Sequence, residues 1–206
     1  FSSNSGLKTS HLLQDKSLVE LAQLLEVSRL IPVSLYGADE SQLSEFYSAL
    51  PGLVSDAYED RPYQEALFAI TGDDVIEHIG VSDTWANHTP YAWQEEIAME
   101  IDMAIQTIRY PDVGLLEHLL TLENIDCARL SIWMHFETNV YPICTQKACE
   151  GLAKLGLETP YRPDDIASYG LYVQRLEGLK IHAPADGMPE IGLPRARILQ
   201  LGLERF

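Results

Sequence analysis

The chain has 206 residues and a formal net charge of −17, from 14 Lys and Arg against 31 Asp and Glu. Hydrophobic residues make up 46% and charged residues 22%, ordinary values that exclude a wholly disordered chain. No apolar run approaches the ~18 residues of a membrane span, and so acidic a chain would approach nucleic acid against its own field. Composition therefore favours an acidic, soluble protein without membrane or nucleic-acid partners.

Cap residues and Pro or Gly stops predict a series of helices in the first part of the chain. They cover about 11–29, opened by the Ser17–Glu20 capping box; Asp39 to Leu50, stopped by Pro51-Gly52; Pro62 to just before Gly72; and Asp74 with Glu77 to near Gly80.

The clearest predicted element is a helix from Thr89 to Arg109. Thr89 is a favourable N-cap, and Pro90 stands at the first helical position. Apolar residues recur at steps of three and four and form one stripe for the core: Trp93, Ile97, Ile101, Ala104, Ile105 and Ile108. The rest of the helix carries carboxylates and no base before its last residue.

Helix signals continue through the second half of the chain. We expect helices from Asp112 to Leu122, Asp126 to Val140, Pro142 to Leu155, Asp164 to Gly178 and Arg195 to Phe206. Residues 181–194 are rich in Pro and Gly, which predicts an irregular segment that wraps over the body. Without period-two alternation, the chain reads as a single all-α domain over 1–206, an irregular multi-helix bundle.

A weak internal repeat leaves a second architecture open. Ile76-Glu77-His78-Ile79 recurs 40 residues later as Leu116-Glu117-His118-Leu119, and Trp93 and Trp133 have the same spacing. A period near 40 is typical of HEAT-like helix pairs, but an array needs at least three copies. We therefore rank HEAT-like pairs below the irregular bundle.

The two Glu-His dyads are also the best candidate metal ligands. Glu77, His78, Glu117 and His118 would make a helical di-iron-like enzyme, but such sites use Glu-x-x-His, with both ligands on one helix face. Adjacent helical residues point about 100° apart, so the dyads are more simply interpreted as structural. Standard nucleotide and zinc-protease motifs are absent, so no cofactor or metal is predicted.

The three cysteines, Cys127, Cys144 and Cys149, are an odd and sparse set. Such a set is typical of free thiols in a reducing compartment, which predicts a cytoplasmic protein.

The acidic residues are concentrated in the middle of the chain. Residues 30–108 hold fifteen carboxylates and one base, Arg61. From these we predict a partner-binding face that attracts a basic protein: Asp73, Asp74, Glu95, Glu96, Glu100 and Asp102. The alternative is a solvated acidic surface that only keeps the protein in solution.

Three functions remain open from the sequence. The first is a non-catalytic module whose acidic face engages a basic partner, as an antitoxin or immunity-type inhibitor would. The second is the metal-dependent enzyme, and the third is a structural adaptor. Residues 112–140 are apolar on more than one face, which also leaves a homodimer open.

Overall fold

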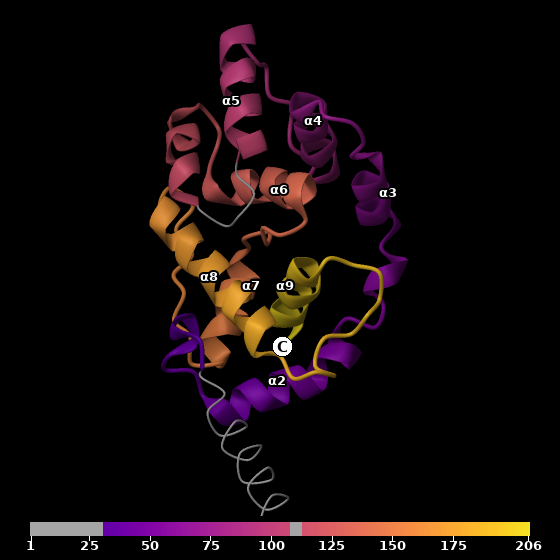
Figure 1. The fold of residues 1–206 in the computed structure, drawn as a ribbon, viewed down its shortest axis with the longest axis vertical. Coiled ribbons are helices and arrows are strands. Elements are labelled where there is room, and N and C mark those ends of the chain that lie inside the picture. Colours follow the sequence, from indigo (N-terminus) through magenta and orange to yellow (C-terminus); the bar gives the residue numbers. More distant parts are fainter. Residues whose placement is uncertain (1–30, 108–112) are drawn as a thin grey trace, which may run out of the picture. The chain divides into compact units, whose positions relative to one another are not determined.

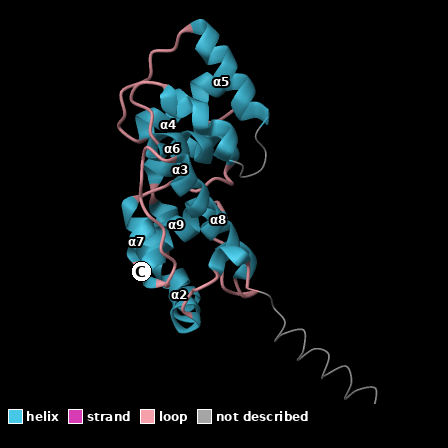
Figure 2. Cartoon of the chain, turned by 90° about the vertical axis from the view of Figure 1, so that its left-hand side faces the viewer, coloured by secondary structure: helices cyan, strands magenta, loops and turns pink. Residues whose placement is uncertain are grey.

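A computed structural model describes residues 31–107 and 113–206. The chain divides into two units, Phe1–Ile31 and Pro32–Phe206, and all the described helices belong to the second. Its described residues are helices joined by loops, with no strand among them (Figures 1 and 2). The expected all-α irregular bundle is therefore confirmed. The helix expected over 11–29 and its Ser17–Glu20 box lie outside the described residues.

The described elements follow one another with short connections. The α-helices are α2 (Glu40–Leu53), α3 (Arg61–Ala69), α4 (Val75–Trp85), α5 (Glu95–Thr107), α6 (Cys127–Thr138), α7 (Gln146–Lys154), α8 (Ile166–His182) and α9 (Arg195–Arg205). Three 3-10 helices stand between them: η1 (Val33–Leu35), η2 (Ala57–Glu59) and η3 (Val113–Thr121). None of these described helices combines the length and low charge needed to cross a bilayer.

Helix packing gathers these elements into two neighbouring groups (Figure 1). In the first, α4 packs against α3, α5 and α6; in the second, α9 packs against α2, α7 and α8. Contacts between α8 and η3 join the groups. Trp133 and Phe136 fill the first core, and Phe46 and Leu199 fill the second, each of them at most 1% exposed. The first group holds most of the residues that matter for function.

Three predicted N-caps are confirmed by their hydrogen bonds. The Asp39 carboxylate accepts from the amides of Ser41 and Gln42, at 3.0 and 3.2 Å. Asp74 accepts from the Glu77 amide at 3.2 Å, and Asp126 accepts from the Arg129 amide at 2.8 Å. A cap needs only residues within one turn, so a local sequence pattern suffices to find it.

The helix predicted from Thr89 begins instead at Glu95, so its predicted start is wrong. The Thr89 carbonyl accepts a hydrogen bond from the Arg129 guanidinium at 2.8 Å and is held by α6. The Trp93 ring packs on Tyr91 and Trp133, with ring centroids 4.5 and 5.5 Å apart. These tertiary contacts hold residues 89–94 out of the helix, against their local cap signal.

Other boundaries shift by a few residues. Helix α2 continues through Pro51 to Leu53, α7 begins after Thr145 rather than at Pro142, and Asp165, not Asp164, caps α8. Helix α8 continues to His182, so the irregular segment covers 183–194 rather than 181–194.

The 40-residue repeat does not give two copies of one structure. Its first copy, 76–79, lies in α4, an α-helix, and its second, 116–119, lies in the 3-10 helix η3. Asp112, the predicted start of the second helix, lies outside the described residues. The described part of the chain thus gives these two segments no common structural unit.

Candidate functional site

The exposed face of α5 combines carboxylates with methionine side chains. Glu95, Glu96 and Glu100 are exposed, and between them Met99 and Met103 are 63% and 69% exposed. Spacings of three and four residues place these side chains on one side of the helix. We call these five residues the α5 face.

The opposite side of α5 anchors the helix to the core. Ile101 and Ile105 are 1% and 2% exposed, and α5 packs against α4 and η3. The α5 face therefore makes no contribution to the core, and its composition is free to serve another purpose. Large apolar side chains on a surface are informative when they gather beside charged ones.

The structure divides the predicted acidic set among three settings. Glu95, Glu96 and Glu100 share the α5 face. Asp102, on the same helix, is half-buried. Asp73 and Asp74 are exposed just before α4, where Asp74 serves as the N-cap. Helix α4 packs against α5, so these carboxylates lie on neighbouring elements, not on a single helix face.

His78 is held by two hydrogen-bond acceptors. Its Nδ1 lies 2.7 Å from a Glu137 carboxylate oxygen, and its Nε2 lies 2.8 Å from the Thr71 carbonyl oxygen. Neither partner donates, so the ring donates from both nitrogens and is protonated. Burial alone lowers the pKa of His78, but the hydrogen bonds to Thr71 and Glu137 outweigh it and raise the pKa above its ordinary value.

The four candidate metal ligands are not brought together. Glu77, Glu117 and His118 are exposed, whereas His78 is buried against Glu137. Within residues 31–107 and 113–206, no three His, Cys, Asp or Glu side chains form a group that could hold a metal ion. In the described residues the partner of His78 is a carboxylate on α6, which sequence spacing did not suggest.

A buried ion pair connects α4 to α6. The Arg129 guanidinium donates to both carboxylate oxygens of Asp83, at 3.1 and 2.9 Å, and the Trp133 indole donates to the same carboxylate at 2.8 Å. Asp83 is 1% exposed and Arg129 is 6% exposed. Both charges are saturated by hydrogen bonds, so this group is structural rather than reactive.

A second buried group joins α3, α6 and α9. The Tyr63 hydroxyl lies 2.7 Å from His135 Nε2, and His135 Nδ1 donates to the Tyr141 carbonyl at 2.8 Å. Because that carbonyl only accepts, Nδ1 carries the proton, and Tyr63 donates to Nε2. The Arg197 guanidinium lies 4.5 Å from the Tyr63 ring centroid and 3.5 Å from Asp60. These groups satisfy one another, which leaves no free base for catalysis at this point.

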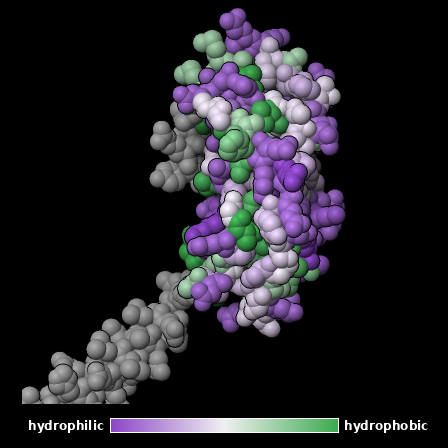
Figure 3. All heavy atoms as spheres, turned by 90° about the vertical axis from the view of Figure 1, so that its right-hand side faces the viewer, coloured by the Kyte–Doolittle hydropathy of each residue, from purple (hydrophilic) through white to green (hydrophobic). Residues whose placement is uncertain are grey.

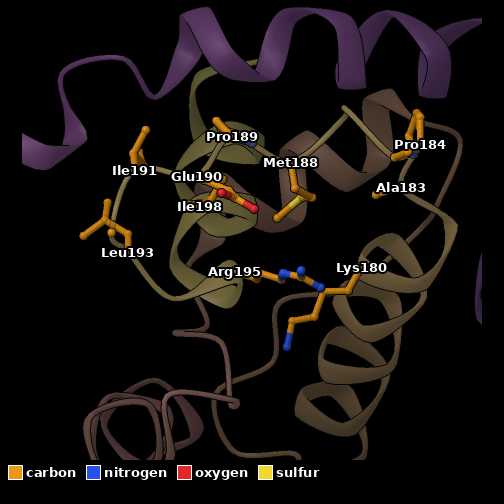
Figure 4. A pocket seen from close by; sticks show the side chains of 12 residues that line it. Lys180, Ala183, Pro184, Met188, Pro189, Glu190, Ile191, Leu193, Arg195 and Ile198 are labelled. Carbon is orange, nitrogen blue, oxygen red and sulfur yellow. The ribbon is translucent and has the colours of Figure 1, made fainter.

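One pocket of about 450 Å³ lies between α8, α9 and the 183–194 segment (Figure 4). Lys180 and Arg195 extend into it, and Glu190 reaches it from the opposite side. Lys180 is already paired with Glu177 and also donates to the Val140 carbonyl. The two positive charges at the pocket are thus matched by two carboxylates, so the pocket does not favour an anion.

A larger groove of about 910 Å³ runs between α3 and α4. Its apolar lining consists of Pro62, Ala66, Val81, Trp85 and Pro90, and its carboxylates are Glu65 and Glu77. Neither Glu65 nor Trp85 stood out in the sequence. The available signal was the pattern Gly80, Val81, Thr84 and Trp85, which places a glycine and a tryptophan on one face of a predicted helix.

Comparison with known proteins gives no functional precedent: the chain matches no protein-family model, and no curated protein and no solved structure is significantly similar to it. The functional argument therefore rests on the surfaces and contacts of the chain itself.

Proposed function

We propose that the protein is a non-catalytic binding module whose acidic α5 face engages a basic partner protein. The observation that carries this proposal is the α5 face itself. Glu95, Glu96 and Glu100 surround the exposed Met99 and Met103, and no base lies among them. Glu96 and Glu100 are like charges four residues apart, which disfavours the helix by a few tenths of a kcal/mol. A face selected only for stability would interleave lysines.

The two residue types of the face have complementary roles in binding. Carboxylates at the rim of an interface attract a cationic partner and mainly raise its association rate. Methionine side chains are flexible and polarizable, so they adapt to the apolar surface of a partner. Inhibitors of the antitoxin or immunity type, which neutralise a cationic protein, are the class that this combination favours.

The experiment reverses the charge of the face. Glu95→Lys, Glu96→Lys and Glu100→Lys are combined in one variant, because all three side chains are exposed and none serves the core. The control variant reverses three exposed carboxylates elsewhere, at Glu45, Glu150 and Glu158. Wild-type protein and control, captured at low salt from the native cell, should enrich the same basic protein, and the α5 variant should lose it.

The identified partner then allows a kinetic measurement. Stopped-flow association should slow at least about tenfold in the α5 variant and lose its dependence on salt, as expected when electrostatic attraction is removed. Circular dichroism should show that all three proteins are equally helical. Equal association rates at low salt in the α5 variant and wild type would mean that the acidic face is only a solvated surface.

A further inference from the structure

The groove between α3 and α4 has an apolar floor that water can reach. Ala66 from α3 and Val81 and Trp85 from α4 form this floor, and Val81 and Trp85 are each half-buried. Figure 3 views the side on which these helices lie and shows hydrophobic residues among hydrophilic ones in its upper half. The volume of about 910 Å³ is enough for several side chains of a partner.

Trp85 is fixed in place from beneath the groove. Its ring lies 5.8 Å from the Tyr63 ring centroid and 5.0 Å from that of Phe136, and the Arg197 guanidinium lies 5.4 Å from the Trp85 centroid. Three contacts from α3, α6 and α9 therefore hold the ring in one orientation. A partly exposed tryptophan that needs no reordering is the usual kind of binding hot spot.

Gly80 keeps the middle of the groove open. A Cβ atom at this position would have no heavy atom within 4 Å, so the protein interior does not require a glycine. Glycine inside a helix is less favourable than alanine, so α4 is weakened without any gain in packing. The absent side chain does, however, leave space above Val81 and Thr84 for another molecule.

The charges at the groove are of one sign. Glu65 on α3 and Glu77 on α4 line it, both exposed, and no Lys or Arg is among the lining residues. Arg197 lies beneath the floor, 6% exposed and 3.5 Å from Asp60. An apolar floor with a carboxylate from each wall complements a helix that has one apolar face flanked by Lys or Arg.

We propose that the α3–α4 groove binds a basic amphipathic helix of the partner protein, with the apolar face of that helix on Trp85 and its basic residues opposite Glu65 and Glu77. This inference rests on the proposed function, because it assumes the same class of partner, and it names the part of the partner that is recognised. The α5 face would then attract the partner, and the groove would hold it.

A synthetic peptide serves as the probe. It is an 18-residue labelled helix with Leu on one face and Lys on the other, and its binding is followed by fluorescence anisotropy. Two control peptides replace Lys by Glu, or keep the composition but scatter Leu around the helix. The groove is filled by Gly80→Leu, and the matched control is Gly52→Leu in α2, where a Cβ would also meet nothing within 4 Å.

Gly80→Leu should weaken binding of the Leu/Lys peptide at least about tenfold, as loss of an anchoring contact does, and Gly52→Leu should leave it within about twofold of wild type. Neither control peptide should bind measurably. Thermal melts should show that Gly80→Leu is no less stable than wild type, since a helical glycine is replaced. Equal binding to Gly80→Leu and wild type, or equal binding of the scattered peptide, would overturn the groove proposal.

The same variants separate the two proposals. If Gly80→Leu leaves both peptide and partner binding unchanged while the α5 charge reversal abolishes partner binding, the groove proposal fails and the α5 face remains. If Gly80→Leu abolishes peptide and partner binding while the charge reversal changes neither, the groove stands and the α5 face is not the recognition element.

Discussion

At the scale of single residues, two buried histidines respond to pH in opposite directions. His135 is 0% exposed, and burial lowers its pKa to about 4 from an ordinary value of 6.5. His78 is held by Thr71 and Glu137, and its pKa is raised. The folded state thus keeps His135 neutral in acid and His78 charged towards neutral pH.

The first prediction concerns His135 in acid. Between pH 6.5 and 4 the unfolded chain binds a proton that folded His135 refuses, so stability rises with pH there and is lost as pH falls. At about pH 4.5 this should cost about 2–3 kcal/mol relative to pH 7. Urea denaturation of wild type and His135→Gln at both values should show a smaller pH difference in the variant.

The control for this prediction is His78→Gln. The raised pKa of His78 gives stability that is complete below its unfolded pKa and is lost as pH rises through the folded pKa. This variant should therefore keep the acid loss of wild type. An unchanged pH dependence in His135→Gln would mean that His135 can be protonated within the fold.

Sequence could locate caps at this scale but not these pairs. Asp39, Asp74 and Asp126 were found because each cap bonds an amide within three residues. The partner of His78 is 59 residues away, and that of His135 is 72 residues away. No local pattern carries that distance.

At the scale of elements, Asp83 and Arg129 hold α4 against α6. The guanidinium meets the carboxylate through two hydrogen bonds, and the Trp133 indole adds a third. The same Arg129 also holds the Thr89 carbonyl and the Asn124 carbonyl, at 2.8 and 3.3 Å. One side chain therefore positions two helices and the loop that leads into α5.

The second prediction is that Asp83→Ala destabilises the fold strongly. Removal of one partner leaves the Arg129 charge buried without its counterion, which typically costs about 3–5 kcal/mol. Denaturant unfolding measures the loss, and Asp74→Ala, which removes only an exposed N-cap, should cost about 1 kcal/mol. The double variant Asp83→Leu, Arg129→Met should lose less than Asp83→Ala alone; a larger loss would contradict a penalty due to the unpaired charge.

The start of α5 shows why element boundaries escaped the sequence. Thr89 and Pro90 are a sound local start signal, but the Thr89 carbonyl is bonded to a guanidinium forty residues later. The buried stripe was nevertheless identified through Ile101 and Ile105, because helical periodicity survives a shifted start.

At the scale of the whole molecule, the three thiols report on global unfolding. Cys127, Cys144 and Cys149 are buried and unbridged. Burial raises the pKa of Cys127 to about 12, and a hydrogen bond with Cys149 together with burial raises that of Cys144. A thiol reacts as its thiolate, so both are protected by their pKa as well as by their position.

The third prediction is that native protein should not react with a thiol reagent such as DTNB on the time scale of minutes, and that all three thiols should react after denaturation in guanidinium. Cys127 lies in α6 and Cys149 in α7, so exposure of both requires the two helix groups to open. Labelling rates in increasing denaturant should follow the unfolding transition. Rapid labelling of one native thiol would reveal a local opening instead.

The fold class was predictable at this scale, and the groove was not. Absence of period-two alternation sufficed to predict an all-α protein. The groove exists only because α3 and α4 lie side by side, which depends on Tyr63 and Trp85 meeting Phe136 of α6. Sequence spacing within α4 showed the face that carries Gly80 and Trp85, but not what stood opposite.

The exposed methionines give the α5 face a chemistry beyond charge. An oxidant that adds oxygen to the thioether of Met99 or Met103 replaces an apolar, flexible end by a polar sulfoxide, and methionine sulfoxide reductases reverse this change. Ile101 and Ile105 lie on the protected side, so the helix itself would persist. The adhesive half of the face would thus depend on the oxidation state of its surroundings, while its carboxylates would not.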